Sequence, residues 1–387
     1  MDRVYLDHAA TTPLDPEVLT AMEPYLLEQY GNASSVHQLG REARVAMEQA
    51  RERVAACLGA ESGEIVFTSG GTEADNLALK GILRDASTEE TPAGLITSAA
   101  EHEAVLRPAE RLAEQGHPVE ILTPGEHGAV SPEQVATAID EQTALVSLMH
   151  TNNEIGVQTD ISAVAEVCHA HDVLLHCDAV QAAGLQQLDV DHLGVDLLSM
   201  SGHKFYGPKG IGVLYVRNGV DLGPLVEGGA QERERRGGTE NVPGAIGLAE
   251  ALERAVEGVE ERAERLSRLQ RRLIDGLDDA VPGPYVLNTP IDDAPVAPHI
   301  VNVAFPPEEE PLDGEMLILN LDMQGVLVSA GSACTSGALE PSHVLTAIGL
   351  DRPVASAAVR FSVGTNTTEQ DVDYALEKLQ STLQRMR

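Results

Sequence analysis

One lysine of this sequence occupies a position where an amine can do covalent chemistry. Lys204 ends an apolar, strand-like run at 196–204 and is followed at once by a turn of sequence Phe-Tyr-Gly-Pro-Lys-Gly. The chain contains only four lysines although arginine is common, so Lys204 is not simply one of many solubilising charges. An amine held at the end of a strand can form a Schiff base with a carbonyl group.

An aspartate stands in a matching position upstream. Asp178 closes the apolar run 173–178, and Gln181 follows three residues later. A carboxylate at a strand end can keep a pyridinium nitrogen protonated. A lysine alone after a strand is usually structural, but the lysine and the acid together indicate pyridoxal 5'-phosphate (PLP) as the cofactor.

A PLP site also needs donors for the phosphate group. The segment Thr-Ser-Gly-Gly-Thr at 68–72 joins a predicted strand to a predicted helix, and its glycines allow the backbone to approach an anion. Such turns are common, so this motif is weak by itself. The dipeptide Glu-His at 101–102 follows another predicted strand and places an imidazole at the same edge of the sheet. The phosphate donors that we expect are Gly71, Thr72, Ser201 and His203.

Short apolar runs alternate with helix-forming stretches between residues 64 and 216. This alternation predicts a mostly parallel sheet with helices on both faces. Ligands of such sheets bind beyond the carboxyl ends of the strands, where both Lys204 and Asp178 fall. We expect strands at 64–68, 94–97, 119–122, 144–149, 173–177 and 196–200, and helices at 72–84, 103–115, 131–141 and 160–171.

The C-terminal third has a different pattern. A stripe of leucine, valine and alanine predicts one long helix over 244–279. A Pro-Gly-Pro turn at 282–284 then begins a new part, with a strand at 300–305 and a helix near 368–385.

The length of 387 residues exceeds what one hydrophobic core normally serves, so we expect two domains. We assign residues 14–255 to a large PLP-binding domain. Residues 1–13 and 256–387 form a smaller domain in this assignment, and that smaller domain carries Cys334.

The chain is strongly acidic, with 26 lysines and arginines against 61 aspartates and glutamates and a formal net charge of −35. This charge argues against nucleic acid or an anionic membrane as a partner. Acids spread over the whole chain suit high salt, because the Debye length is only ~3 Å at 1 M and self-repulsion is then screened. We interpret the charge as halophilic adaptation, with simple solubility as the alternative.

The N-terminus has acids where a secretory signal needs a positive start, and no apolar run approaches the ~20 residues of a membrane span. We therefore expect a cytoplasmic protein. The four cysteines show no Cys-x-x-Cys spacing, so neither disulfides nor a structural zinc site is expected. Cys57, Cys168 and Cys177 lie in apolar surroundings typical of inert core thiols. Cys334 instead lies among small and polar residues with glycines on either side, which predicts a mobile loop.

These segments together resemble the cysteine desulfurases, in the branch associated with iron–sulfur cluster assembly and nitrogenase maturation. The resemblance implies an aspartate-aminotransferase-like α/β fold of type I, with a large, mostly parallel domain and a smaller α/β domain. It also implies a PLP-dependent homodimer of the class V aminotransferase family. The motifs that carry the resemblance lie at 5–13, 67–73, 101–102, 152–156, 178–181, 201–204, 237–241, 332–336 and 359–362.

The resemblance gives the expected cofactor-binding residues their roles. Lys204 would hold the cofactor covalently and act as catalytic base, and Asp178 would pair with the ring nitrogen. Gln181 would contact the ring hydroxyl, while His102 would stack over the ring and take part in catalysis. Thr239 would reach the phosphate in the partner subunit, which places the active sites at the interface of the homodimer.

The substrate-binding residues follow from the same resemblance. Asn153, which also contacts the cofactor, and Arg360 would hold the substrate carboxylate, a role that suits the two-pronged guanidinium. Two loop positions depart from the family pattern: Ala33 stands where proline is frequent, and Glu234 stands where glycine is common.

Cys334 matches the family nucleophile. By this resemblance, L-cysteine gives L-alanine and a persulfide on Cys334, which supplies sulfur for iron–sulfur cluster assembly and other thio-cofactors through an acceptor or scaffold protein. A free thiol has a pKa near 8.5, so the site must help to deprotonate it, and His102 is the candidate. No resident metal is expected, although Cys334 is a potential transient ligand of an iron–sulfur cluster.

Three other functions remain open at this point. A selenocysteine lyase would share nearly every site residue. A class V aminotransferase would keep Lys204 and Asp178 without needing the thiol, and would release a keto acid. A catalytically silent platform for a sulfur-carrier protein would not need all of Lys204, Asp178 and Cys334.

Overall fold

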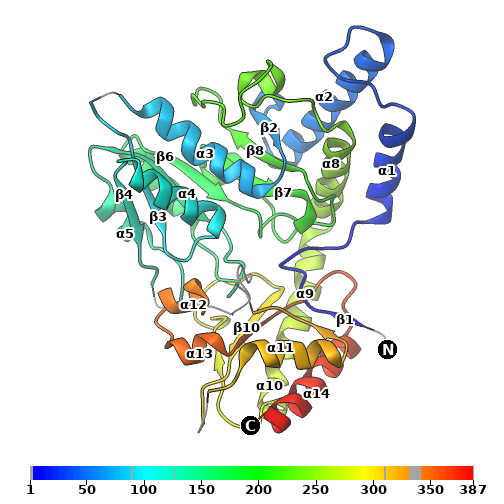
Figure 1. The fold of residues 1–387 in the computed structure, drawn as a ribbon, viewed down its shortest axis with the longest axis vertical. Helices are drawn as coiled ribbons and strands as arrows, with labels where there is room; N and C mark the ends of the chain where they lie inside the picture. The colour runs from blue at the N-terminus through cyan, green and yellow to red at the C-terminus, as the bar shows by residue number, and fades with distance from the viewer. Residues whose placement is uncertain (1–2, 89, 126, 309–310, 331–340, 387) are drawn as a thin grey trace.

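The computed structural model describes residues 3–88, 90–125, 127–308, 311–330 and 341–386. Its largest sheet has seven strands in the order β2-β8-β7-β6-β5-β3-β4. In Figure 1 this sheet lies in the upper part of the molecule, and the yellow to red C-terminal elements form the lower part. The strands are β2 (Ile65–Thr68), β3 (Gly94–Ser98), β4 (Val119–Leu122), β5 (Thr143–Met149), β6 (Leu174–Asp178), β7 (Leu197–Ser201) and β8 (Gly212–Val216).

The prediction of a mostly parallel sheet is confirmed. Strands β4, β3, β5, β6 and β7 pair in parallel, whereas β8 is antiparallel to both of its neighbours, β7 and β2. The carboxyl ends of all strands but β8 therefore meet at one edge of the sheet. The sequence patterns give these strands to within one residue at either end, except β8, which they do not single out.

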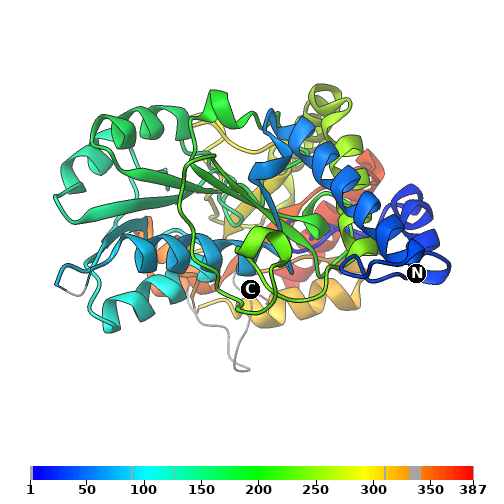
Figure 2. The same cartoon turned by 90° about the horizontal axis from the view of Figure 1, so that it is seen from above.

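Helices cover both faces of the sheet, as Figure 2 shows from above. Side chains alternate between the faces: in β8, Val213 and Tyr215 join one core, and Leu214 and Val216 join the other. Because both faces are buried, the central strands are largely apolar, whereas the edge strand β4 carries the exposed Glu120. The first core also takes residues of α1 (Pro16–Leu27), α2 (Gln38–Leu58), α6 (Ile161–Ala170) and α8 (Val242–Val256), and the second takes residues of α3 (Gly71–Ala86) and α4 (Glu103–Glu114).

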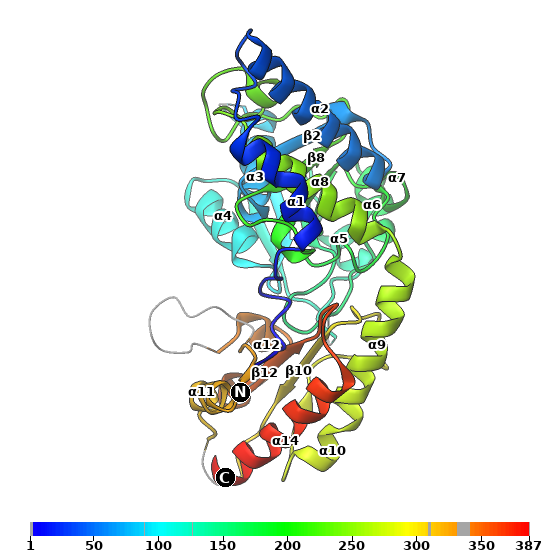
Figure 3. The same ribbon diagram turned by 90° about the vertical axis from the view of Figure 1, so that its right-hand side faces the viewer.

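A smaller core surrounds a three-stranded antiparallel sheet of order β12-β10-β9, made by β12 (Ala358–Ser362), β10 (Ile300–Ala304) and β9 (Val286–Leu287). Strand β1 (Val4–Tyr5) pairs in parallel with β11 (Val326–Leu327), so the start of the chain packs with C-terminal elements. Figure 3 shows α9 beside this sheet, running down toward the C-terminal helix. Leucines of α9 (Val259–Asp275), α11 (Gly314–Met323) and α14 (Glu369–Met386) fill the core.

The single helix predicted over 244–279 is wrong. Helix α8 ends at Val256, and Gly258 adopts a left-handed φ of 66° before α9 begins. The guanidinium of Arg262 donates to the carbonyl oxygens of Arg254, Ala255 and Glu257, which satisfies the end of α8. The apolar stripe continues across this break because α8 packs on the large core and α9 packs on the small one.

No helix among the described ranges is long and apolar enough to cross a membrane. The remaining elements of the fold are short. The short elements are α5 (Pro132–Ala138), α7 (Val190–Leu193), α10 (Leu277–Ala280), α12 (His343–Ala347), α13 (Arg352–Ser356) and the 3-10 turns Ser62–Glu64, Gly202–Lys204 and Gln231–Glu234.

Candidate active site

The carboxyl edge of the large sheet opens into a cavity of about 370 Å³. Residues from strand ends, helix starts and the small core meet there because the parallel strands deliver their termini to the same edge. Two predicted residues are not in this wall: Thr239 is exposed outside it, and Cys334 lies outside the described residues. The predicted residues that line the cavity are Gly71, Thr72, His102, Asn153, Asp178, Gln181, Ser201, His203, Lys204 and Arg360.

Asp178 is the last residue of β6 and is buried at this edge. Its Oδ1 accepts the backbone N–H of Val180 at 2.9 Å. Burial raises the pKa of the Asp178 carboxyl, while the positive charge of Lys204 works in the opposite direction. A buried carboxylate is costly unless a cation lies beside it, so a protonated pyridine nitrogen is a favourable partner for this side chain.

Lys204 ends the 3-10 turn that follows β7. Its Nζ donates to the carbonyl oxygens of Ala9 at 2.6 Å and Ala10 at 3.0 Å, both in the N-terminal segment. Burial, together with the nearby positive charge of Arg360, lowers the pKa of Lys204 to about 8. The amine is therefore partly neutral near neutral pH, which both nucleophilic attack and proton abstraction require.

The start of α3 forms an anion-binding end of the cavity. Gly70 is the N-cap with a φ of 156°, and it has no side chain to cap the first N–H groups. A Cβ on Gly71 would lie 2.7 Å from Cγ2 of Val180, so the close packing here requires glycine. Thr72 and Ser201 line the same cavity. N–H groups at the start of a 16-residue helix attract negative charge.

His203 completes this end of the cavity from the turn before Lys204. Its Nδ1 lies 3.1 Å from Oγ1 of Thr11. Burial lowers the pKa of His203 to about 4, and the charge of Lys204 adds to the shift. The ring is therefore neutral at pH 7. It can form a hydrogen bond with an anion, but it contributes no positive charge.

His102 is the N-cap of α4, and its side chain is exposed at the cavity. Its Nδ1 accepts the backbone N–H of Ala104 at 3.0 Å. This hydrogen bond fixes the tautomer, because a neutral ring with Nδ1 as acceptor carries its proton on Nε2. Desolvation by the surrounding protein atoms lowers the pKa of His102. The neutral ring thus has a proton to give at Nε2.

Arg360 comes from the small core, on β12, and is 3% exposed. Its two terminal nitrogens donate to the carbonyl oxygen of Asn153 at 2.7 Å and to Oδ1 of Asp7 at 2.8 Å. Its Nε has no hydrogen-bond partner among the described residues. Backbone hydrogen bonds in both directions join Arg360 to Ser329, which also lines the cavity.

Sequence reasoning missed several residues of the wall. Asp75 on α3 is fully buried beside Asp178, and burial and the charge of Asp178 raise its pKa well above the usual value. Only its place on a buried helix face could have indicated it. Ala9 and Ala10 contribute carbonyl groups, which side-chain patterns do not reveal. His343, which comes shortly after residues 331–340 in the sequence, also lines the cavity.

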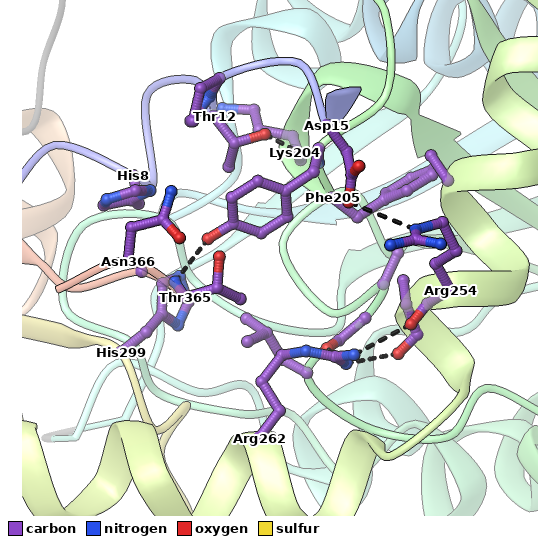
Figure 4. A pocket seen from close by; sticks show the side chains of 18 of the residues that line it. His8, Thr12, Asp15, Lys204, Phe205, Arg254, Arg262, His299, Thr365 and Asn366 are labelled. Atoms are coloured by element: carbon purple, nitrogen blue, oxygen red, sulfur yellow. Dashed lines mark hydrogen bonds and ion pairs between the residues drawn. The ribbon is translucent and has the colours of Figure 1, made fainter. Parts of the chain in front are cut away.

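A second cavity of about 440 Å³ lies on the other side of Lys204 (Figure 4). Tyr206 lines it, and its hydroxyl accepts the backbone N–H of Thr365 at 2.7 Å. Arg254 points toward Asp15 at 3.3 Å. Neither the start of α3 nor Asp178 lines this cavity, so it lacks both the anion-binding end and the acid that a pyridine phosphate needs.

The loop that carries Thr239 begins with a strained segment. Glu232, Arg233 and Glu234 all have positive φ, at 45°, 56° and 66°. The left-handed conformation explains why glycine suits the position of Glu234. Glu232 is held by two hydrogen bonds to the guanidinium of Arg51, at 2.7 and 2.9 Å, and accepts the backbone N–H of Phe67.

Comparison with known proteins gives a consistent result. The family model for aminotransferase class-V matches residues 4–375. Cysteine desulfurase IscS of Dictyoglomus turgidum is 45% identical over 384 residues, which are 99% of this chain and 95% of that protein. The putative cysteine desulfurase IscS 1 of Bacillus subtilis is 43% identical over 387 residues, which span both proteins completely.

Solved structures agree with the sequence relatives. A structure described as a NifS-like protein superposes with a TM-score of 0.90 and 38% identity, covering 99% of this chain and 100% of that chain. A structure described as SspA in complex with cysteine has a TM-score of 0.80 and 38% identity, and the match covers 93% of this chain and 98% of that chain. The chain belongs to the class V aminotransferase family and, within it, to the cysteine desulfurases.

Proposed function

We propose that this protein is a PLP-dependent cysteine desulfurase that converts L-cysteine to L-alanine and leaves the sulfur as a persulfide on Cys334. One observation carries the proposal: a single cavity gathers Lys204, Asp178 and Arg360 from three separate elements. A relative of similar fold is described with cysteine bound, which supports the choice of substrate.

The cavity fits PLP. The start of α3, whose first N–H groups have no side-chain cap, suits the phosphate, and the buried Asp178 suits the ring nitrogen. Gln181 lines the wall, with its Nε2 donating to the carbonyl oxygen of Ala9 at 2.7 Å. When bound, PLP supplies an electron sink that makes the α-proton of an amino acid acidic.

Lys204 and His102 divide the proton transfers. Nζ of Lys204, whose pKa is lowered to about 8, attaches the cofactor and then takes the proton from the substrate α-carbon. Nε2 of His102 carries a proton in the tautomer fixed by Ala104, so this nitrogen suits donation to the reacting group. The same hydrogen bond occupies the Nδ1 lone pair, which argues against His102 as the base that deprotonates Cys334.

The substrate carboxylate binds at Arg360 in this proposal. The guanidinium lines the cavity, and each of its terminal nitrogens has one N–H left beyond those that bind Asn153 and Asp7. Asn153 fixes one terminal nitrogen of Arg360 through its own carbonyl group. An amino acid held there by its carboxylate presents its α-carbon toward Lys204.

Cys334 is within reach of this cavity along the chain. Ser329 and His343, which flank the segment 331–340, both line the cavity wall. Cys334 follows Ser329 by five positions in the sequence, and an extended chain spans at most ~3.5 Å per residue, so at most roughly 17 Å of chain joins the two Cα atoms. As a thiolate, Cys334 attacks the sulfur of the substrate and forms a sulfur–sulfur bond. The bond between this sulfur and the substrate β-carbon breaks, its electron pair stays with the substrate, and the β-carbon takes a proton.

The proposal includes a cytoplasmic homodimer that passes sulfur to an acceptor or scaffold protein for iron–sulfur cluster assembly. Thr239 supports the dimer, because it is exposed on a loop fixed by a buried ion pair and does not line the cavity of its own chain. We also propose domains of residues 14–255 and of 1–13 with 256–387. The division of core residues between the larger and smaller sheets supports this boundary.

The decisive experiment measures alanine. The purified protein, loaded with PLP and given L-cysteine without reductant, is expected to form about one alanine per subunit and then stop, because the persulfide blocks the thiol. Added dithiothreitol should restore continuous turnover by removing the sulfur. Continuous formation of a keto acid, with no alanine, would instead identify an aminotransferase.

We further propose that the acidic surface is adapted to high salt. With a net charge of −35, the folded protein should melt at a higher temperature in 2 M potassium chloride than in 0.1 M, because salt screens self-repulsion. Circular dichroism melts at the two concentrations measure the difference. Equal or lower melting temperatures in molar salt would leave simple solubility as the explanation of the charge.

A further inference from the structure

The N-terminal segment is part of the wall of the candidate active site, although it lies far from the other wall residues in sequence. It passes between the two cores next to β12, where the backbone N–H of His8 donates to the carbonyl oxygen of Ser362 and that of Ser362 donates to the carbonyl oxygen of Leu6. This pairing places Asp7 opposite Ser362, two residues beyond Arg360 on β12.

Asp7 is the carboxylate that contacts Arg360. Its Oδ1 lies 2.8 Å from a terminal nitrogen of the guanidinium, and its side chain is 21% exposed, against 3% for that of Arg360. The carbonyl oxygen of Asn153 holds the other terminal nitrogen at 2.7 Å. A guanidinium gripped at both terminal nitrogens cannot rotate freely, so its remaining donors keep a fixed direction.

We propose that Asp7 is a positioning residue for substrate binding: together with the carbonyl group of Asn153 it fixes the guanidinium of Arg360, so that the remaining N–H groups of its two terminal nitrogens keep the direction in which they bind the substrate carboxylate. The inference rests on the proposed function, in which Arg360 binds that carboxylate. Asp7 does not line the cavity. Its charge also raises the pKa of Lys204, but that effect acts on every amine ligand alike, whereas its contact with Arg360 acts only on a carboxylate.

Two effects of Asp7 on a bound carboxylate oppose each other. Its negative charge competes with the substrate for Arg360, so its loss would strengthen the attraction between guanidinium and substrate. Its hydrogen bond holds the guanidinium in place, and its loss would free a long side chain to adopt other rotamers, which costs affinity. The second effect dominates in this proposal, because Arg360 is buried and its direction decides whether its donors reach the ligand.

The test compares two ligands that differ only by the carboxylate. L-alanine and ethylamine are titrated into the PLP-loaded protein, and binding is followed by the visible absorbance of the cofactor. Asp7→Ala should weaken L-alanine about tenfold, the effect expected from one lost hydrogen bond to a charged group. The same change should leave ethylamine within about twofold of the wild type, because ethylamine has no carboxylate for Arg360 to hold.

Two further variants separate positioning from charge. Asp7→Asn keeps an oxygen acceptor for Arg360 without the charge, so it should bind L-alanine within about threefold of the wild type. Arg360→Gln should abolish the preference for L-alanine over ethylamine, and adding Asp7→Ala to it should then change nothing. Asp15→Ala is the matched control, because Asp15 lies in the same N-terminal segment but pairs with Arg254 outside this cavity.

The outcomes are distinct. If Asp7→Ala binds L-alanine as tightly as the wild type or more tightly, Asp7 acts only as a competing charge and the inference is overturned. If it weakens both ligands equally, the residue maintains the fold and the inference is again wrong. If the wild type forms no alanine from L-cysteine, the proposed function fails instead, and that result is obtained before any variant is made.

Discussion

Lys204→Met should lose at least about a thousandfold of cysteine-dependent alanine formation, since it removes the covalent attachment and the general base together. The variant should still bind PLP, because the start of α3, Asp178 and the surrounding wall remain. Alanine release measures the first effect, and retention of the cofactor after desalting measures the second. Lys209→Met, at an exposed lysine outside the cavity, is the matched control and should keep full activity.

The same variant should stabilise the cofactor-free protein. The pKa of Lys204 is lowered from 10.5 to about 8 by burial, so its charged form costs on the order of 3 kcal/mol of folding free energy. The cost is fully present below pH 8, where the amine is charged in both states, and vanishes above pH 10.5, where it is neutral in both. Urea unfolding of both proteins at pH 7 and pH 10.5 should therefore show the gain at pH 7 only.

Cys334→Ala should bind L-cysteine and change the cofactor absorbance, yet release almost no alanine. Cofactor attachment and α-proton removal use Lys204 and Asp178, whereas breaking the carbon–sulfur bond needs a nucleophile that accepts sulfur. In the wild type given limiting L-cysteine without reductant, mass spectrometry should find one extra sulfur on the peptide that contains Cys334. Dithiothreitol should remove that sulfur.

The other three cysteines are internal controls for this assignment. Burial raises the pKa of Cys57 to about 11 and that of Cys168 to about 12, and it raises the pKa of Cys177 well above the usual value. All three are therefore protonated and poor nucleophiles near neutral pH. Sulfur found on any of them, or normal turnover by Cys334→Ala, would show that the nucleophile is wrongly assigned.

The amino-acid pattern is enough to predict the large sheet and most of the site. Strands buried on both faces must be apolar throughout, so their runs and the helices between them can be located from composition alone. Parallel strands deliver their carboxyl ends to one edge, which is why the pattern predicts that Asp178, Lys204 and the start of α3 meet. Strand β8, with the apolar run Gly-Val-Leu-Tyr-Val, follows the same rule and was missed although its pattern matches that of the other strands.

Contacts between segments distant in sequence depend on the folded chain. No sequence pattern indicates that the carbonyl groups of Ala9 and Ala10 accept hydrogen bonds from Lys204, or that Asp7 binds Arg360. These contacts depend on how the N-terminal segment passes between the two cores. The stripe over 244–279 likewise hides the break at Gly258, since each half keeps helical spacing while facing a different core. Periodicity reports which side of an element is buried, and only the tertiary packing determines what lies against that side.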